Sequence, residues 1–571
     1  MKKNDVVIGV VSAMGCNYEG IVKTDGTVCF VPFSLNGEKV EFKVLKVNKN
    51  LAYGKLTEVL TPADERVRPV CKYFKKCGGC RLQHVKYREQ LKFKTAQVKD
   101  CFRKIAGINA EVLPTQKSLN EYNYRNKLQL PVRDVDGETK LGFFAENSHR
   151  LIEVDCCAIQ QDWANKIISI FKEFIRKYHI QGYSEERGDG ILRHIVVRNV
   201  QNTLLIVAVI NGKELPHAQE LIEMLKYSFK KFSFFTSENT NNDNVIMGET
   251  VKKLYGVDKV TLEENGVKYS IGPLSFMQVN DAVKTKLYQD VVKSLDLNEN
   301  SVVIDAFSGA GLLTAIIAQT AKKAIGVEIV PEAVDSANEL KKANGLTEKM
   351  ENVLGACEDV LPEIMTRKEI KDSELSVVLD PPRKGVEAKV LYAVIAAKPK
   401  TIVYVSCSPQ TLARDIGILT GALYYDGAEL KKAQDYSPKY EIAKIQPYDM
   451  FPQTKHVETL VVLSKKIPDS HINIDVEFGE GEGQFSLKKI KECAEARKPK
   501  EKVTYKMIQE YIEKTYGFKV HTAYIAEVKR DLGLPMYDAP NAVGELKRPR
   551  AHPTPKMAKA IKETLKHFEI I

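Results

Sequence analysis

The sequence predicts an α/β protein whose largest domain is a Rossmann-like, doubly wound parallel sheet. Three observations support this. Between residues 280 and 465, apolar runs rich in β-branched side chains alternate with helical stretches, as strand–helix–strand units require. Residues 1–60 instead alternate apolar and polar positions between glycine turns, which favours a β-barrel. Beyond residue 467, a glycine-rich stretch precedes helical periodicity.

Length and composition suggest a multidomain protein with a polyanionic partner. The 571 residues exceed what one core can organise, so three to four domains are expected. The formal charge of +11 favours a partner such as nucleic acid. Eleven cysteines are an odd number and too few for a disulfide scaffold. The apolar run at residues 6–14 is too short and glycine-interrupted for a signal peptide, and no run is long enough to span a membrane. We therefore expect a reduced, cytoplasmic protein without membrane association, and no obligate protein partner is evident.

The predicted barrel, residues 1–60, is of the oligonucleotide-binding kind. Asp25-Gly26 indicates a hairpin between two strands. Lys46 and Lys49 would give the barrel a cationic rim that suits RNA. A barrel that only packs against a neighbouring domain would show the same pattern.

Residues 61–270 open with three cysteines within ten positions, Cys71, Cys77 and Cys80. The two glycines between Cys77 and Cys80 allow the backbone to wrap closely around a bound cluster. A fourth ligand is needed, and the Cys156-Cys157 pair is the nearest candidate. Four thiolates suit either zinc or an iron–sulfur cluster, and the spacing does not separate a structural from a redox role.

The rest of residues 61–270 is predicted to be a mixed α and β region. Basic residues stand beside strand-like runs at 124–127 and 190–198. Such groups could position phosphates, but basic residues are equally common on solvated faces of sheets.

The third domain, residues 271–466, carries the features of a nucleoside-binding sheet edge. The strand at 301–305 runs into a glycine loop at 306–311, where a ligand can approach the backbone. The next strand ends at Glu328, which is placed to accept hydrogen bonds from a ribose diol. A later strand ends at Asp380, held by the two prolines that follow. Because only two glycines of the dinucleotide fingerprint are present, a compact nucleoside such as S-adenosylmethionine is favoured.

Cys407 lies between a buried strand and a helix that begins at Pro409. A helix N-terminus lowers the pKa of a thiol, so we expect a reactive thiolate here. Methylation of a base amine needs no thiol, and Arg383 stands where such enzymes place an aromatic residue. Methylation of uracil carbon 5 does need one, because thiolate addition to carbon 6 makes carbon 5 nucleophilic. A base must then remove the proton from carbon 5, and Glu458 at the start of the last strand is the candidate.

Together these motifs resemble the RNA (uracil-5) methyltransferase family, specifically its iron–sulfur 23S rRNA branch with an N-terminal TRAM domain. The resemblance spans residues 1–465. The matching segments are Cys71 to Cys80, Cys157-Ala158-Ile159, Ser275-Phe276-Met277-Gln278-Val279-Asn280, the loop 305–311, Asp380 to Gly385, Val405-Ser406-Cys407 with its following Pro-x-Thr-Leu-Ala-Arg-Asp, and His456-Val457-Glu458. Two positions depart from the usual pattern, since Ser408 replaces an asparagine and Met277 an aromatic residue.

The resemblance implies a residue for each role. Cys407 would be the nucleophile and Glu458 the base. S-adenosylmethionine would contact Gln278, Phe307, Glu328, Asp380 and Asn344. A [4Fe–4S] cluster would be bound by Cys71, Cys77, Cys80 and Cys157, with Cys157 chosen over Cys156 because it matches the family's cysteine pattern.

We thus expect an enzyme that makes 5-methyluridine in 23S rRNA. A tRNA T-loop uracil, or an RNA-binding or chaperone protein without activity, are the alternatives. A redox protein would leave the donor pocket unexplained.

Residues 467–571 lie beyond the resemblance. Residues 479–483 are predicted to be a linker, 502–516 and 522–532 helices, and 547–550 a basic stretch before a lysine-rich helix. A helix-turn-helix-like RNA-binding module, a basic appendage and a protein-docking module all fit this pattern.

Overall fold

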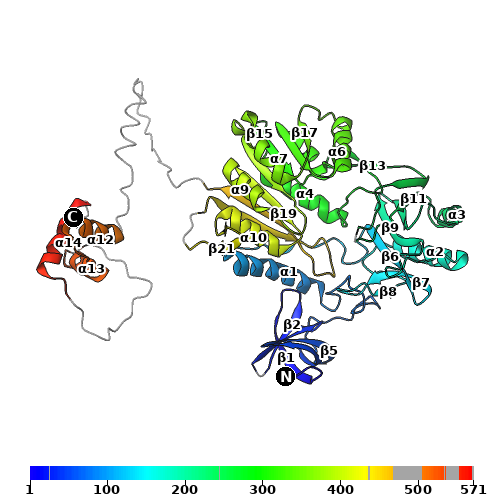
Figure 1. The fold of residues 1–571 in the computed structure, drawn as a ribbon, viewed down its shortest axis with the longest axis horizontal. Coiled ribbons are helices and arrows are strands. Elements are labelled where there is room, and N and C mark those ends of the chain that lie inside the picture. Colours follow the sequence, from blue (N-terminus) through cyan, green and yellow to red (C-terminus); the bar gives the residue numbers. More distant parts are fainter. Residues whose placement is uncertain are drawn as a thin grey trace, which may run out of the picture. The chain divides into compact units, whose positions relative to one another are not determined.

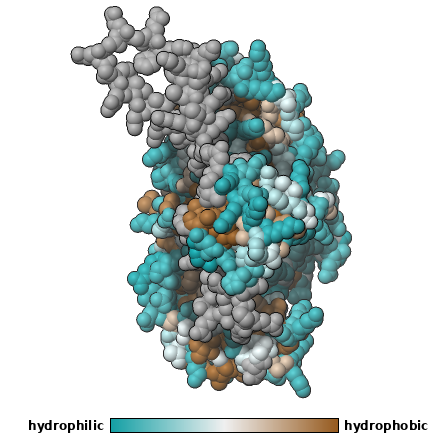
Figure 2. Space-filling model, turned by 90° about the vertical axis from the view of Figure 1, so that its left-hand side faces the viewer, coloured by the Kyte–Doolittle hydropathy of each residue, from teal (hydrophilic) through white to brown (hydrophobic). Residues whose placement is uncertain are grey.

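The structure is a computed structural model that describes residues 1–24, 26–243, 245–434, 438–466, 505–532, 534 and 552–568. The chain forms two compact units, Met1–Ile467 and Pro468–Ile571, which are described separately (Figure 1). In the described residues no helix is both long and apolar enough to cross a membrane. Figure 2 shows one face, on which the described residues are mostly hydrophilic.

The N-terminal strands close into the predicted β-barrel. Its strand order is β1-β2-β3-β5-β4, and the strands are β1 (Val6–Met14), β2 (Glu19–Thr24), β3 (Thr27–Pro32), β4 (Lys39–Asn48) and β5 (Leu51–Thr61). Alternate side chains such as Val22, Val31 and Phe42 point inward and are fully buried. Gly54 is required on β5, because a Cβ there would lie 2.5 Å from the Phe42 ring. The hairpin joins β2 to β3 through Gly26, while Asp25 lies outside the described residues.

The central region is a seven-stranded sheet with the order β12-β11-β10-β9-β6-β7-β8. Its strands are β6 (Lys127–Val135), β7 (Glu138–Phe144), β8 (Leu151–Glu153), β9 (Leu192–Val200), β10 (Thr203–Ile210), β11 (Phe232–Glu238) and β12 (Val251–Tyr255). Helices α2 (Trp163–Tyr178) and α3 (Ala218–Ser228) bury their apolar stripes on one face. The other face packs against the hairpin of β13 (Val260–Glu264) and β14 (Val267–Ile271), and against Met277.

The third region contains the predicted doubly wound sheet, with the order β17-β16-β15-β18-β19-β23-β22. Six strands run in the same direction, and β23 is inserted antiparallel between β19 and β22. The strands are β15 (Ser301–Ala306), β16 (Lys323–Glu328), β17 (Met350–Leu354), β18 (Glu374–Leu379), β19 (Thr401–Ser406), β22 (Tyr440–Tyr448) and β23 (Glu458–Lys465). The helices are α4 (Asp281–Leu295), α5 (Leu312–Thr320), α6 (Pro331–Ala343), α7 (Cys357–Ile364), α8 (Lys368–Lys371), α9 (Ala388–Ala397) and α10 (Pro409–Thr420), and β20 (Leu423–Asp426) pairs with β21 (Glu429–Lys432).

One helix lies within the predicted central domain, residues 61–270, but packs against the doubly wound sheet. Helix α1 (Tyr87–Cys101) continues into a short π-helix, η1 (Phe102–Ala106), and both contribute to the core of the doubly wound sheet. Val98, Phe102 and Ala106 recur every four residues and form the apolar stripe that packs there. Periodicity shows that such a stripe is buried, but it does not show which domain covers it. For this reason the helix was predicted to belong to the central region.

The described residues of the C-terminal unit form the helices α12 (Tyr505–Tyr516), α13 (Thr522–Asp531) and α14 (Pro555–His567). Their shared core includes Ile508, Ile512, Ile525, Ile561 and Leu565, all fully buried. The helical periodicity of the sequence is therefore matched by packed helices. The predicted linker at 479–483, the basic stretch at 547–550 and residues 502–504 lie outside the described residues.

Candidate active site

The carboxyl ends of four parallel strands lie at one edge of the doubly wound sheet. Ala306 is paired with Val327 and Leu379, and Leu379 with Tyr404. The residues that follow these strand ends are thereby brought together, which is where an open α/β sheet binds ligands. Sequence-predicted Phe307, Glu328, Asp380 and Cys407 all lie at this edge.

The glycine loop and Glu328 form one hydrogen-bonded unit. Glu328 Oε2 accepts a hydrogen bond of 2.9 Å from the Gly309 N–H, and Oε1 accepts one of 2.9 Å from each of the Ile329 and Val330 N–H groups. Phe307 has φ = 66°, a conformation that costs free energy in a residue other than glycine. The half-exposed carboxylate is fixed by three donors and retains lone pairs for a diol, so it fits a nucleoside ligand.

Two aspartates at the strand ends are held in a low-dielectric environment. Burial and, to a lesser extent, the neighbouring Asp305 together raise the pKa of Asp380 to about 7. Burial also raises the pKa of Asp305 to about 7, although its carboxylate accepts a 2.6 Å hydrogen bond from the Thr314 hydroxyl. A positively charged ligand, such as a sulfonium, would stabilise the ionised form of both carboxyl groups.

Cys407 and Glu458 come together through the antiparallel pairing of β19 and β23. Ser406, the last residue of β19, is paired with Thr459, the second residue of β23. One further step along this register brings Cys407 opposite Glu458. Both residues could be chosen from their local patterns, but their juxtaposition could not, because the sequence does not reveal which strand lies beside β19.

Burial governs the acidity of the Cys407 thiol. It raises the thiol pKa above its ordinary value, and the nearby Glu458 raises it further. The prediction of a pKa lowered by the α10 N-terminus is therefore wrong in direction. Desolvation of the thiolate is the largest cause of this upward shift.

Arg383 opposes this effect and was not predicted as a site residue. Its guanidinium lies beside the thiol and lowers the Cys407 pKa. Its position in the Asp-Pro-Pro-Arg loop could have marked it as a site residue. From the sequence, Arg383 was interpreted only as the absence of an aromatic residue.

Glu458 is 4% exposed, and burial raises its pKa well above the ordinary value, with Asp380 adding to the shift. A carboxylate destabilised by burial has a high affinity for a proton. Such a group suits proton abstraction once it is ionised.

The Asp-Pro-Pro loop is fastened to the segment after Cys407. The buried Asp415 carboxylate accepts hydrogen bonds from the Val386 N–H, the Tyr404 hydroxyl and the Arg414 guanidinium. The Thr411 hydroxyl donates to the Arg383 carbonyl. This explains the Thr-Leu-Ala-Arg-Asp motif after the cysteine, because it fixes the loop that carries Asp380 and Arg383.

The structure ties Gln278 to the central region and places Asn344 away from the carboxyl ends of the strands. The Gln278 carbonyl accepts a 3.0 Å hydrogen bond from the Asn126 side chain, while the Gln278 side chain is half-exposed. Asn344 follows the last residue of α6, near the start of β17, at the opposite edge of the sheet from the carboxyl ends. Its side-chain oxygen accepts a hydrogen bond from the Lys268 N–H, and its side-chain nitrogen donates one to the Lys268 carbonyl. The predicted donor contact of Asn344 is corrected accordingly: its side chain anchors α6 to β14.

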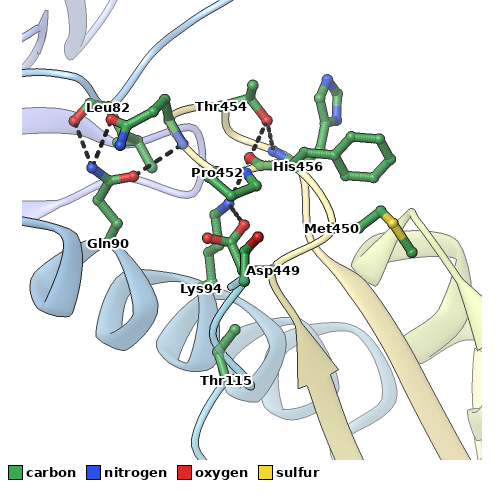
Figure 3. Close-up of polar contacts among 12 residues, drawn as sticks. Leu82, Gln90, Lys94, Thr115, Asp449, Met450, Pro452, Thr454 and His456 are labelled. Atoms are coloured by element: carbon green, nitrogen blue, oxygen red, sulfur yellow. Dashed lines mark hydrogen bonds and ion pairs between the residues drawn. The ribbon is translucent and has the colours of Figure 1, made fainter. Parts of the chain in front are cut away.

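The loop before β23 is anchored to α1 (Figure 3). Lys94 and Asp449 form a buried ion pair, and the Lys94 ammonium also donates to the Phe451 carbonyl. The Gln90 amide donates to the Gln453 side chain, and the Arg81 and Leu82 N–H groups donate to the Gln453 carbonyl. The segment that begins one residue after Cys80 is thus hydrogen-bonded to the loop that leads to Glu458.

The cysteines of the two predicted segments lie near one another. Charges on Cys71, Cys77 and Cys157 would each raise the pKa of the Cys80 thiol, which is already raised by burial. Backbone N–H groups point at the sulfurs: those of Tyr73 and Phe74 at Cys71, Gly79 at Cys77, and Ile159 and Gln160 at Cys157. These donors would stabilise thiolates at three of the four cysteines, Cys71, Cys77 and Cys157. Among the residues that the structure describes, however, no three His, Cys, Asp or Glu side chains are arranged as a metal-binding group.

Comparison with known proteins gives the family. Residues 86–466 match the family described as tRNA (uracil-5-)-methyltransferase, and residues 11–57 match the TRAM domain. An uncharacterised RNA methyltransferase of Clostridium acetobutylicum is 40% identical over 471 residues, which cover 81% of this chain and 98% of that protein. One from Clostridium tetani is 40% identical over 467 residues, covering 81% and 97%.

A solved structure has the same fold. It is the Pyrococcus abyssi tRNA (uracil-54, C5)-methyltransferase in complex with S-adenosyl-L-homocysteine, with a TM-score of 0.61 and 24% identity, covering 80% of this chain and all of that one. The matched family extends over the edge that carries Asp380, Cys407 and Glu458. The chain belongs to the tRNA (uracil-5-)-methyltransferase family, whose members are S-adenosylmethionine-dependent RNA methyltransferases acting on carbon 5 of uracil, and it carries an N-terminal TRAM domain.

Proposed function

We propose that this chain makes 5-methyluridine in 23S rRNA, with Cys407 as nucleophile and Glu458 as base. The observation that carries the proposal is the register of β19 and β23, which opposes the two residues at the edge that also holds Asp380. A thiol and a buried carboxyl group side by side are what a reversible addition to uracil requires.

The chemistry of the protein groups follows from this arrangement. The Cys407 sulfur adds to carbon 6 of uracil, with Arg383 favouring the thiolate. The electron pair of the 5,6 double bond becomes available at carbon 5. After methylation, Glu458 takes the proton from carbon 5, the double bond reforms and the sulfur leaves. Because the Glu458 carboxyl is buried, it holds that proton away from bulk water.

S-adenosylmethionine, when bound, supplies the methyl group as an electrophile. Glu328 would accept hydrogen bonds from its ribose, and Asp380 would oppose its positive charge. Phe307 and Gln278 would flank it from the glycine loop and the segment 275–280.

We further propose that Cys71, Cys77, Cys80 and Cys157 bind a [4Fe–4S] cluster. The N–H groups directed at the sulfurs support this, since such donors stabilise cluster thiolates. Anaerobic reconstitution with iron and sulfide should give a visible absorption band that Cys157→Ser loses. Cys156→Ser should retain it. Equal loss in the two variants would assign the fourth ligand differently.

The 23S rRNA target rests on the resemblance of the cysteine motif and TRAM domain to that branch. The deciding experiment incubates the purified chain with methyl-labelled S-adenosylmethionine and, separately, unmodified 23S rRNA and tRNA. Labelled 5-methyluridine in rRNA supports the proposal. Label in tRNA alone would keep the chemistry and change the target, and no label with the donor bound would favour a non-catalytic RNA-binding protein. Action on ribosomal RNA would also agree with the expected cytoplasmic location.

We also propose the C-terminal unit as an RNA-binding module. Exposed Lys556, Lys559, Lys562 and Lys566 recur at helical spacing along one face of α14. Such a stripe suits a phosphate backbone. Lys559→Glu combined with Lys562→Glu in the full chain should weaken RNA binding and leave S-adenosylhomocysteine binding unchanged. Unchanged RNA affinity would instead favour a protein-docking role.

A further inference from the structure

Lys127 and Arg198 form a like-charged pair in the central sheet. Lys127 of β6 lies directly opposite Arg198 of β9 in the antiparallel register. Residues opposite each other in such a pair extend from the same face of the sheet, and like charges at these positions destabilise it. Something outside the pair must compensate if the arrangement is to serve the protein.

Within the described part of the chain, the pair has no such compensation. Arg198 is 4% exposed, and its Nε and Nη1 atoms are buried without a hydrogen-bond partner. The Lys127 carbonyl accepts hydrogen bonds from the side chains of Arg125 and Gln160, and the Lys127 ammonium forms no ion pair within the described residues. Buried donors without acceptors are costly, and a buried guanidinium is ordinarily paired.

The surroundings make the site more positive. Burial lowers the pKa of Lys127 to about 8, and the charged groups that act on it, Arg198 and Arg125, are both cations. Burial also lowers the pKa of Arg198, to about 10. Both shifts would be relieved by an anion between the two side chains.

Contacts of neighbouring residues connect the pair with the candidate active site. Arg198 shares its face of β9 with Val196 and Val200, which pack against Met277. Asn126, next to Lys127, donates from its N–H to the Val279 carbonyl and from its side chain to the Gln278 carbonyl. Arg125 lies close enough to His456 to lower the pKa of its imidazole, and His456 stands two residues before Glu458.

We propose that Lys127 and Arg198 bind one backbone phosphate of the RNA substrate, next to the nucleotide that reaches Cys407. The inference rests on the proposed RNA methyltransferase function and adds a positioning site to it. Arg198 Nε with a neighbouring guanidinium nitrogen can donate two parallel hydrogen bonds to a phosphodiester, and Lys127 adds a point charge. Such contacts fix the register of the RNA without reading its sequence.

The carboxylate of the methyl donor is a second anion that Lys127 and Arg198 could bind in place of the RNA phosphate. The phosphate is favoured because the pair belongs to the central sheet, whereas the glycine loop and Glu328 belong to the doubly wound sheet. Binding of S-adenosylhomocysteine separates the two sources.

The test compares Arg198→Met and Lys127→Met with a matched control in the full chain. Lys140→Met removes the same charge from the same sheet, at a residue that is ion-paired with Glu138. Binding of unmodified 23S rRNA and tRNA transcripts is measured from about 50 to 200 mM KCl. Each test variant should bind RNA about tenfold more weakly, and its slope of log affinity against log salt should shrink by about 0.7 to 0.9. The control should match the wild type in both quantities.

Two further measurements separate a ligand site from a structural one. Removing one like charge should leave the unfolding midpoint unchanged or higher without RNA, and S-adenosylhomocysteine affinity should not change. Arg198→Lys, which keeps the charge, should retain the salt slope but lose part of the affinity. A lower midpoint with an unchanged salt slope would overturn the proposal. Weakened S-adenosylhomocysteine binding with intact RNA binding would assign the pair to the donor carboxylate. Because no methyl transfer is measured, an error in the proposed RNA target would leave the slope change intact.

Discussion

Lys94 and Asp449 form an ion pair in which both side chains are completely buried. The two residues join α1 to the loop before β23, although the chain between them contains the central sheet and all strands of the doubly wound sheet except β23 (Figure 3). A buried pair of this kind depends on both partners, since removal of one leaves an unpaired charge in the interior. The position of Glu458 at the start of β23 therefore depends on a lysine far away in the sequence.

Replacing Lys94 by methionine should destabilise the protein by about 3 to 5 kcal/mol, because Asp449 would remain buried without its counterion. Urea unfolding monitored by circular dichroism measures the change. The control is Lys92→Met on the same helix, whose lysine is 69% exposed and pairs with Glu89. That variant should lose at most about 1 kcal/mol, and equal losses in the two variants would contradict the importance of the buried pair.

Cys407→Ala should lower the methylation rate by at least about 10³-fold, because the variant lacks the sulfur that adds to carbon 6. Binding of RNA and S-adenosylhomocysteine should persist, as measured by filter binding and calorimetry. Cys16→Ala, at an exposed cysteine of the barrel region, should be fully active. Turnover by Cys407→Ala at the wild-type rate would rule out the covalent mechanism.

Glu458→Gln should trap the RNA on the protein. Addition and methylation can proceed, but without the carboxylate the carbon 5 proton stays and the sulfur does not leave. We expect an RNA–protein band that survives denaturing electrophoresis and contains the labelled methyl group. Rapid release of 5-methyluridine without such a band would place the base elsewhere.

Glu458 should also make the protein less stable as the pH rises. Its folded pKa lies well above the ordinary value, so the unfolded chain ionises first and stability falls from about pH 4.5 upward through the folded pKa. Glu458→Gln removes this loss, so the variant should unfold at a higher temperature than the wild type at pH 7 to 8 and at the same temperature near pH 4. Glu441→Gln, at a glutamate that is 60% exposed, should not change the midpoint. A wild-type pH profile for Glu458→Gln would show that the carboxyl is not destabilised by burial.

Arg383 should set the pH range in which Cys407 is reactive. The guanidinium lowers a thiol pKa that burial has raised, so Arg383→Met should raise that pKa further. At a fixed pH the thiolate fraction falls, and the profile of Cys407 alkylation by iodoacetamide should move to higher pH. Mass spectrometry of the Cys407 peptide measures the rate. Lys384→Met, at the neighbouring exposed lysine, is the control, and superimposable profiles for the two variants would remove Arg383 from this role.

Local sequence determined the elements and most of the candidate site. The strand before Cys407, the helix starting at Pro409 and the strand ends at Glu328 and Asp380 follow from short-range patterns, because hydrophobic period, proline and glycine act within a few residues. The parallel sheet then brings those strand ends to one edge, since the carboxyl ends of parallel strands necessarily meet there.

Tertiary structure decided what lies beside what. The pairing of β23 with β19 opposes Cys407 to Glu458, and the packing of α1 on the doubly wound sheet buries Lys94 against Asp449. It also reversed the expected acidity of Cys407, because desolvation is a property of the assembled pocket, whereas the helix N-terminus is visible in the sequence. Asn344 shows the same limit, since its place at the end of a helix was predictable but its bonds to β14 were not. Short-range chemistry is encoded locally, whereas burial and strand neighbours depend on contacts between distant segments.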